Sequence, residues 1–220
     1  SRPELSASRP ELSASRPEAS PVRVDCRDLT PGDAYRLLTL AVTPRPIALV
    51  STLSPDGAPN LAPFSFFMAG GAQPPSIALS PVTPRDRPEK DTLANIRATG
   101  AFVVSAVTDA LVEAANRASA ALPPGCSEWD AAGLTPAPCA HVAPPRVAES
   151  PLSMECLLFR IVSHGQGPLS ANYVIGEVVA FHVDERLSGA LHPGTVGRLA
   201  GDGYVRLADT FTLRRPEDPR

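Results

Sequence analysis

The only lysine of the chain, Lys90, begins a short segment whose residue types could bind an anion. Nineteen arginines supply the other basic side chains, so a lone lysine is either chance or a site that needs a compact ammonium. Lys90, Asp91 and Thr92 precede a predicted helix, and the unpaired N–H groups and dipole at a helix N-terminus favour phosphate. An ordinary capped helix with a solvated lysine is the alternative. The residues alone favour that alternative, because such caps are common.

A second group, Pro63-Phe64-Ser65-Phe66-Phe67, combines proline, aromatic rings and one hydroxyl. Such residues either line an apolar slot or pack in the core of a strand. Alternating residues of a strand point to opposite faces, so we expect Phe66 and Phe67 to separate and at least one phenylalanine to be core.

Patterns for other chemistries are missing from the sequence. It contains neither a GxxxxGK[ST] phosphate loop nor a GxSxG nucleophile motif, and Gly165-Gln-Gly167 lacks the third glycine of a dinucleotide loop. The four cysteines form no CxxC pair and stand at no metal-ligand spacing from a histidine. We therefore expect reduced thiols, no metal and no catalytic acid, base or nucleophile.

The elements that must position these groups are mostly strands. Residues 45–53, 60–68, 77–80, 101–107, 152–163 and 172–183 have strand patterns, and Ser54-Pro55-Asp56-Gly57 is a strong turn signal. Pro63 suggests an edge or bulge and Gly176 a bulge. Short helices are predicted over 33–42, within 90–100 and over 109–121. In the second of these, Asp91 is the expected N-cap and Gly100 the residue after the helix. A proline-rich connection covers 122–151. Many strands and few helices favour an antiparallel barrel with helices at its rim.

Residues 1–20 repeat the sequence SRPELSA, with proline at positions 3, 10 and 17. A proline every seventh residue prevents a helix, and the repeat has few large apolar residues. We expect a disordered tail, native or added, followed by a single folded domain over residues 21–220.

Several segments, in order, resemble the flavin reductase-like family of FMN-binding split-barrel proteins. The family pattern opens with PRPIA-V-T, a turn, N-APFSFF and a PP dipeptide, which matches residues Thr43–Ser80. The family's KDTxxNI motif matches Lys90–Ile96. Shorter matches are Ala115–Ser119, Ala132–Pro136, Pro144–Pro151, Ile175–Val178, Gly197–Leu199 and Tyr204.

The resemblance implies a mostly β, antiparallel split barrel with few helices, a homodimer, and one FMN near the interface. It implies phosphate contacts from Lys90 and Thr92, with Ser80 and Arg85 close by in sequence. Arg85 or Arg45 would be the phosphate site if Lys90 were not. For the flavin ring, the resemblance implies contacts with Asn60, Pro63, Phe64, Ser65, Phe66 and Phe67. Asn116 and Ser119 would lie at the rim of the site near the flavin. Arg198 and Tyr204 would cover the cofactor from a partner subunit.

Three functions are open at this point. The resemblance favours a flavin reductase that transfers a hydride from NADH or NADPH to the flavin and feeds a flavin-dependent monooxygenase. An FMN-holding electron carrier, like a flavoredoxin, and a non-catalytic flavin-binding or interaction barrel are the alternatives. In each case the cofactor carries the redox chemistry and the protein positions it.

Composition restricts partners and compartment. A net charge of −3 and a pI near 5.8 give no reason to expect nucleic acid or an anionic membrane surface. The longest apolar runs are far shorter than the ~20 residues of a membrane span, and no N-terminal apolar segment indicates secretion. We expect a cytoplasmic protein.

Overall fold

The computed structural model describes residues 22–120, 122, 126–190, 192–207 and 209–214, so the predicted tail of residues 1–20 lies outside the described residues. The helices are η1 (Cys26–Asp28), α1 (Pro31–Ala41), α2 (Asp91–Thr99), α3 (Val112–Arg117), α4 (Glu128–Ala132) and η2 (Glu185–Leu187). The strands are β1 (Ala48–Leu53), β2 (Pro59–Phe64), β3 (Phe67–Ala72), β4 (Pro75–Leu79), β5 (Ala101–Ala106), β6 (Pro136–Ala137), β7 (Arg146–Val147), β8 (Leu152–His164), β9 (Ala171–Val183), β10 (Val196–Arg198) and β11 (Tyr204–Arg206).

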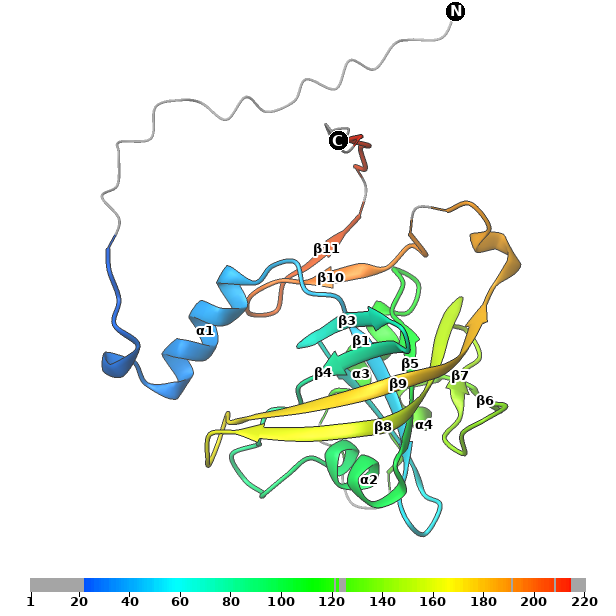
Figure 1. Cartoon of the computed structure of the whole chain (residues 1–220), viewed down its shortest axis with the longest axis horizontal. Helices are drawn as coiled ribbons and strands as arrows, with labels where there is room; N and C mark the ends of the chain where they lie inside the picture. Colours follow the sequence, from blue (N-terminus) through cyan, green and yellow to red (C-terminus); the bar gives the residue numbers. More distant parts are fainter. Residues whose placement is uncertain (1–21, 121, 123–125, 191, 208, 215–220) are drawn as a thin grey trace, which may run out of the picture.

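Seven strands form one sheet in the order β2-β1-β5-β8-β9-β4-β3, and every neighbouring pair is antiparallel. β2 and β3 are the two edges of this sheet, yet only Ser65 and Phe66 separate them in the chain. Three Cα–Cα steps reach at most about 11 Å, so the edges must approach each other and the sheet must curl into an incomplete barrel (Figure 1). The mostly β, antiparallel split-barrel prediction is confirmed.

The single strand predicted over 60–68 is wrong in one respect, because the chain turns at Ser65 and Phe66 and passes from one sheet edge to the other. We call this two-residue connection the corner. The predicted turn before β2 is present: Gly57 has φ 84° and donates its N–H to Ser54 O over 2.9 Å. The expected connection over 122–151 contains α4, β6 and β7.

The N-cap of α2 lies one residue earlier than predicted, since Lys90 and not Asp91 has the extended N-cap conformation. Lys90 forms no side-chain cap bond, and the Asp91 carboxylate instead accepts from Arg87 Nη1 over 2.8 Å. Gly100 ends the helix with φ 71°, a left-handed conformation that glycine adopts without steric cost.

The core lies on both faces of the sheet. Inside the barrel, residues of β1, β4, β5, β8 and β9 pack with Leu93 and Ile96 of α2. On the other face of β1 and β2, Leu49 and Leu61 pack against α3 and α4. A bulge was predicted at Gly176 in β9. The extra residue is instead Phe159 of the neighbouring strand β8, which lies opposite Gly176 and Ile175. Gly176 itself is needed for close packing, since a Cβ there would lie 2.4 Å from Phe102 Cζ.

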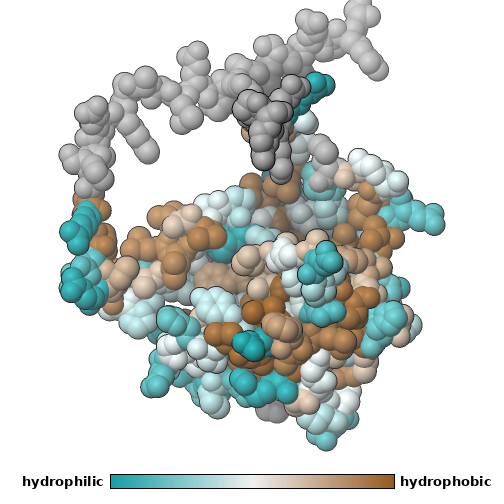
Figure 2. Space-filling view, viewed as in Figure 1, coloured by the Kyte–Doolittle hydropathy of each residue, from teal (hydrophilic) through white to brown (hydrophobic). Residues whose placement is uncertain are grey.

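Two elements of the fold, a helix and a strand pair, expose several large apolar side chains. One is α1, with Leu38 and Leu40 more than half exposed, and the other is β8 and β9, where Phe159 is 68% and Phe181 54% exposed. Figure 2 shows hydrophobic surface in both regions on one face of the molecule. None of the helices in the described ranges is long and apolar enough to cross a membrane.

Candidate functional site

A cavity of about 480 Å³ opens beside the corner, and we call it the corner cavity. Its walls come from α1, the corner itself, β3, β4 and the start of β9, and they are largely apolar. The lining residues are Pro31, Ala34, Tyr35, Leu38, Val42, Arg45, Pro46, Ser65, Phe66, Phe67, Met68, Ala78, Leu79, Ser80, Val82, Leu169, Ala171 and Tyr173.

The corner is fixed to β4 and α1. Ser80 donates its backbone N–H to Phe66 O over 2.8 Å, and the Phe66 ring lies 5.6 Å from the Tyr35 ring, a distance typical of an aromatic pair. Phe66 and Phe67 both line the cavity, because the corner interrupts the alternation of a regular strand. Phe64, at 7% exposure, is a core residue.

The buried Arg45 guanidinium holds three parts of the chain together. Its Nη1 donates to Thr39 O at 2.6 Å and Val42 O at 3.0 Å, and its Nη2 donates to Leu199 O at 2.9 Å. Its Nε donates to Ser65 Oγ at 3.3 Å. Burial lowers the pKa of Arg45. Four of the five guanidinium N–H donors are thus used within the chain, so Arg45 positions the end of α1 and the Ser65 hydroxyl.

Two further features make the corner cavity a candidate binding site. The Ser80 hydroxyl is buried and has no hydrogen-bond partner among the described residues, although buried polar groups are normally paired. Leu169 has φ 65°, which is rare for a residue with a branched side chain and is associated with functional sites. A mostly apolar slot with the hydroxyls of Ser65 and Ser80 in its wall fits a flavin ring, which is flat, apolar on its faces and polar along one edge.

A second group of predicted residues lies at the start of α2, outside the walls of the corner cavity. Asn60 Nδ2 donates to Thr92 Oγ1 at 3.0 Å and to Thr52 Oγ1 at 3.3 Å, so the Thr92 hydroxyl is already in a polar network. Lys90 Nζ lies 5.5 Å from the centre of the Phe64 ring. Burial and then the Arg87 charge lower the pKa of Lys90, opposed by Asp86 and Asp91.

Among the described residues no carboxylate forms an ion pair with Lys90. A half-buried ammonium without an acidic partner is suited to bind an anion. Two other predicted residues lie apart from it. Arg85 is exposed and lies near the start of α1. Its Nη2 is 3.9 Å from the position that a Cβ atom on Gly32 would take. Pro63 lies in the edge strand β2, as predicted.

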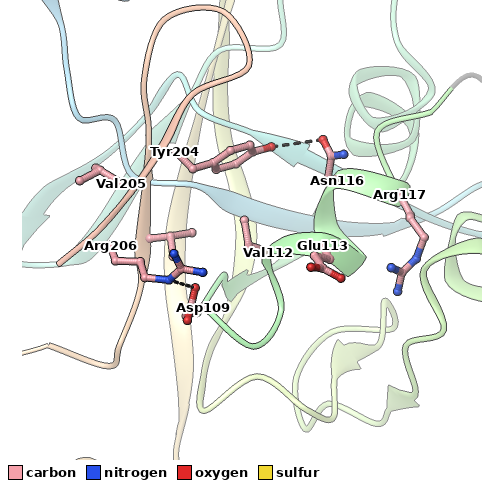
Figure 3. A pocket seen from close by; sticks show the side chains of 9 residues that line it. Asp109, Val112, Glu113, Asn116, Arg117, Tyr204, Val205 and Arg206 are labelled. Atoms are coloured by element: carbon pink, nitrogen blue, oxygen red, sulfur yellow. Dashed lines mark hydrogen bonds and ion pairs between the residues drawn. The ribbon is translucent and has the colours of Figure 1, made fainter. Parts of the chain in front are cut away.

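A third group of predicted residues lies at or near a separate cavity of about 430 Å³ between α3 and β11, which Asn116 and Tyr204 line (Figure 3). Tyr204 Oη donates to Asn116 Oδ1 at 3.2 Å, and Ser119 Oγ donates to Asn116 O at 2.7 Å. The Arg198 guanidinium lies 4.4 Å from the centre of the Tyr204 ring. Within one chain these four residues do not line the corner cavity.

Sequence reasoning missed several cavity residues, notably Tyr35, Leu169, Ala171 and Tyr173. Tyr35 stood in a predicted helix and Tyr173 in a predicted strand, but nothing in their local patterns pointed to the corner. The positive φ of Leu169 cannot be read from a leucine in the sequence.

This chain is similar to a known domain family, to other sequences and to several solved structures. The family model of the flavin reductase like domain matches residues 40–199. An uncharacterized protein of Halalkalibacterium halodurans is 42% identical over 83% of this chain and 90% of its own length. The structure of nitrilotriacetate monooxygenase component B from Bacillus cereus is similar with a TM-score of 0.81, at 35% identity over 89% of this chain and all of that one.

Two further solved structures resemble the chain. They are the 2-nitrobenzoate 2-nitroreductase NbaA of Pseudomonas fluorescens (TM-score 0.77, 31% identity, 89% and 96% coverage) and the flavoredoxin of Desulfovibrio vulgaris (TM-score 0.64, 27% identity, 78% and 91% coverage). The family match, over residues 40–199, spans most of the described part of the chain. The TM-scores show that this chain shares its curled antiparallel sheet with these solved structures. This chain belongs to the flavin reductase-like family of split-barrel proteins.

Proposed function

We propose that the chain binds FMN with its ring in the corner cavity and catalyses hydride transfer from NADH or NADPH to that flavin. The observation that carries the proposal is the buried, unpaired Ser80 hydroxyl in the wall of a mostly apolar cavity. When bound, the flavin supplies the redox chemistry by accepting a hydride from the reduced nicotinamide.

The protein contributes position and exclusion of water. Ser80 and Ser65 would hydrogen-bond to the polar edge of the ring, while Phe66, Phe67 and Tyr35 would cover its apolar parts. Arg45 would keep the Ser65 hydroxyl in place through its 3.3 Å bond. None of these residues needs to act as an acid, a base or a nucleophile.

The FMN phosphate would bind near Lys90, at the N-terminus of α2. The ammonium is half-buried and lies beside Phe64, the residue that precedes the corner. Thr92 and Asn60 would support this end of the site through their hydrogen bond. Arg85 is the alternative phosphate ligand, since it lies near the α1 wall of the corner cavity.

A homodimer completes the proposal. Phe159, Phe181 and Val183 are each more than half exposed on β8 and β9, and such an apolar surface is typical of an interface. In a dimer, Asn116, Ser119, Arg198 and Tyr204 of one chain would lie near the flavin of the other. We propose a cytoplasmic enzyme that supplies reduced flavin to a monooxygenase, as the likeness to a monooxygenase component B suggests.

An FMN-holding electron carrier is the second candidate. The likeness to the Desulfovibrio flavoredoxin at 27% identity favours it. Steady-state oxidation of NADH or NADPH with added FMN separates the two functions, because only the reductase turns over. A yellow protein without turnover would be a carrier, and a protein that takes up no flavin would be neither.

The binding site itself is tested by replacing Ser80 with alanine, which removes the hydroxyl and adds no atom to the cavity wall. Loss of one hydrogen bond, worth roughly 0.5–1.5 kcal/mol, should weaken FMN binding about 2- to 12-fold. Ser51→Ala is the matched control, because the Ser51 hydroxyl is also buried and unpaired among the described residues but does not line the cavity. Equal FMN affinity in the folded Ser80→Ala protein would place the ring elsewhere.

A further inference from the structure

Three side chains from distant parts of the sequence meet at the end of the β8–β9 pair where β8 begins and β9 ends. Cys139 follows β6, Glu155 lies in β8 and His182 lies in β9. One potential ligand atom from each, the Cys139 sulfur, a Glu155 oxygen and a His182 nitrogen, lies within 4.8 Å of the other two. Sequence spacing predicted no metal site, because the pairing of β8 with β9 brings Glu155 and His182 together and the loop after β6, which bonds Glu155 through the Ala140 N–H, brings Cys139 to them.

The Glu155 carboxylate is fully buried and already held from several sides. Its Oε1 accepts from the Ala140 N–H at 2.8 Å, and its Oε2 accepts from the His141 N–H at 2.6 Å and the Val142 N–H at 3.1 Å. The fourth partner is His182 Nε2, 2.6 Å from Oε1. The three backbone bonds are fixed by the loop, whereas the imidazole is 31% exposed and can shift.

We propose that Cys139, Glu155 and His182 bind a divalent transition-metal ion of the zinc type. The ion would take the place of the proton between Glu155 Oε1 and His182 Nε2 and would add the Cys139 sulfur as its third protein ligand. Tetrahedral zinc ligands at about 2.0–2.3 Å from the metal lie roughly 3.3–3.7 Å from one another. The 2.6 Å contact must therefore open by less than about 1 Å, which the exposed imidazole permits.

The surroundings suit such a site. Carboxylate ligands of metals are normally hydrogen-bonded by outer residues, and the N–H groups of Ala140, His141 and Val142 perform that role for Glu155. Thiolate, imidazole and carboxylate together are typical zinc ligands. With three protein ligands, a fourth position is left for water on the exposed side of His182.

Cobalt(II) is a suitable probe, because a thiolate ligand gives it a charge-transfer band and tetrahedral coordination gives it intense visible bands. The full chain is titrated with cobalt(II) and then with zinc, with zinc retention measured by equilibrium dialysis. We expect one metal per chain, a cobalt–thiolate band, and displacement of cobalt by zinc.

Cys139→Ser should abolish the thiolate band. His182→Gln removes a ligand, so it should weaken zinc binding by more than the about 10- to 100-fold that is typical when a residue supporting a ligand is replaced. Cys126→Ser and His164→Gln are matched controls, because both residues are exposed and outside the cluster; they should bind like the wild type. No retained zinc, or a thiolate band that survives Cys139→Ser, would overturn the proposal.

Discussion

Replacing Lys90 by alanine is the most informative test of how this chain would hold FMN. The ammonium lies 5.5 Å from the centre of the Phe64 ring, and no carboxylate in the described part of the chain pairs with it. Its pKa is lowered chiefly by burial, which a bound phosphate dianion would counteract. A charge-assisted hydrogen bond contributes roughly 1.5–3 kcal/mol. Lys90→Ala should therefore weaken FMN binding about 10- to 150-fold.

The assay is quenching of flavin fluorescence during titration with FMN and, separately, with riboflavin. Riboflavin lacks the phosphate, so its affinity for Lys90→Ala should be unchanged. Arg85→Ala is the matched control: it removes a cation from the same loop, and it should leave FMN affinity within about twofold if Lys90 is the phosphate ligand.

Two results would contradict a role of Lys90 as the phosphate ligand. Equal losses for FMN and riboflavin would mean that Lys90 shapes the ring slot. No loss for either ligand would make Lys90 a surface charge, and a large loss in Arg85→Ala would then move the phosphate to the start of α1. Arg45 is a weaker alternative, since four of its five donors already bind groups of the chain.

Ser65→Leu should block FMN binding while the protein stays folded, because the added side chain would enter the corner cavity; wild-type affinity by the same fluorescence titration would contradict this. Deletion of residues 1–20 should leave both the melting temperature and FMN affinity unchanged, and a loss of several degrees would show that the segment packs on the fold. Glu155→Gln should destabilise the chain at neutral pH. Although burial alone would raise the pKa of Glu155, its N–H donors and His182 lower it from 4.5 to about 2, which corresponds to roughly 3 kcal/mol. Since the folded-state pKa is the lower one, this stabilisation is complete above about pH 4.5 and disappears as the pH falls toward 2. Urea unfolding with a chelator present should show the wild-type advantage shrinking across that range, and an advantage independent of pH would be contrary to the argument.

Local patterns predicted much of the fold. The alternating strand over 152–163, the turn at Ser54–Gly57 and the helix ending at Gly100 all depend on neighbouring residues, and the structure has each of them. The N-cap was misplaced by one residue because Asp91 is a good cap in isolation, whereas here its carboxylate pairs with Arg87.

The corner could not be predicted in this way. Residues 60–68 read as one apolar strand, and the break at Ser65 and Phe66 follows only from the sheet order, which places β2 and β3 at opposite edges. The same holds for the cavity wall, where Tyr35, Leu169 and Tyr173 come from three separate elements or connections. The role of Arg45 likewise depends on carbonyl groups of α1 and of the β10–β11 turn, which no local pattern relates to it.

We propose that the chain binds flavin and reduces it with a nicotinamide. The direct measurement is anaerobic mixing of the FMN-loaded protein with NADH or NADPH while the visible flavin absorbance is recorded. We expect the absorbance of the bound flavin to be lost, with one nicotinamide oxidised per flavin, and we expect Ser65→Leu to abolish this reaction. Flavin that binds but stays oxidised with both nicotinamides would contradict the reductase function, and a protein that cannot be loaded with FMN would contradict the site.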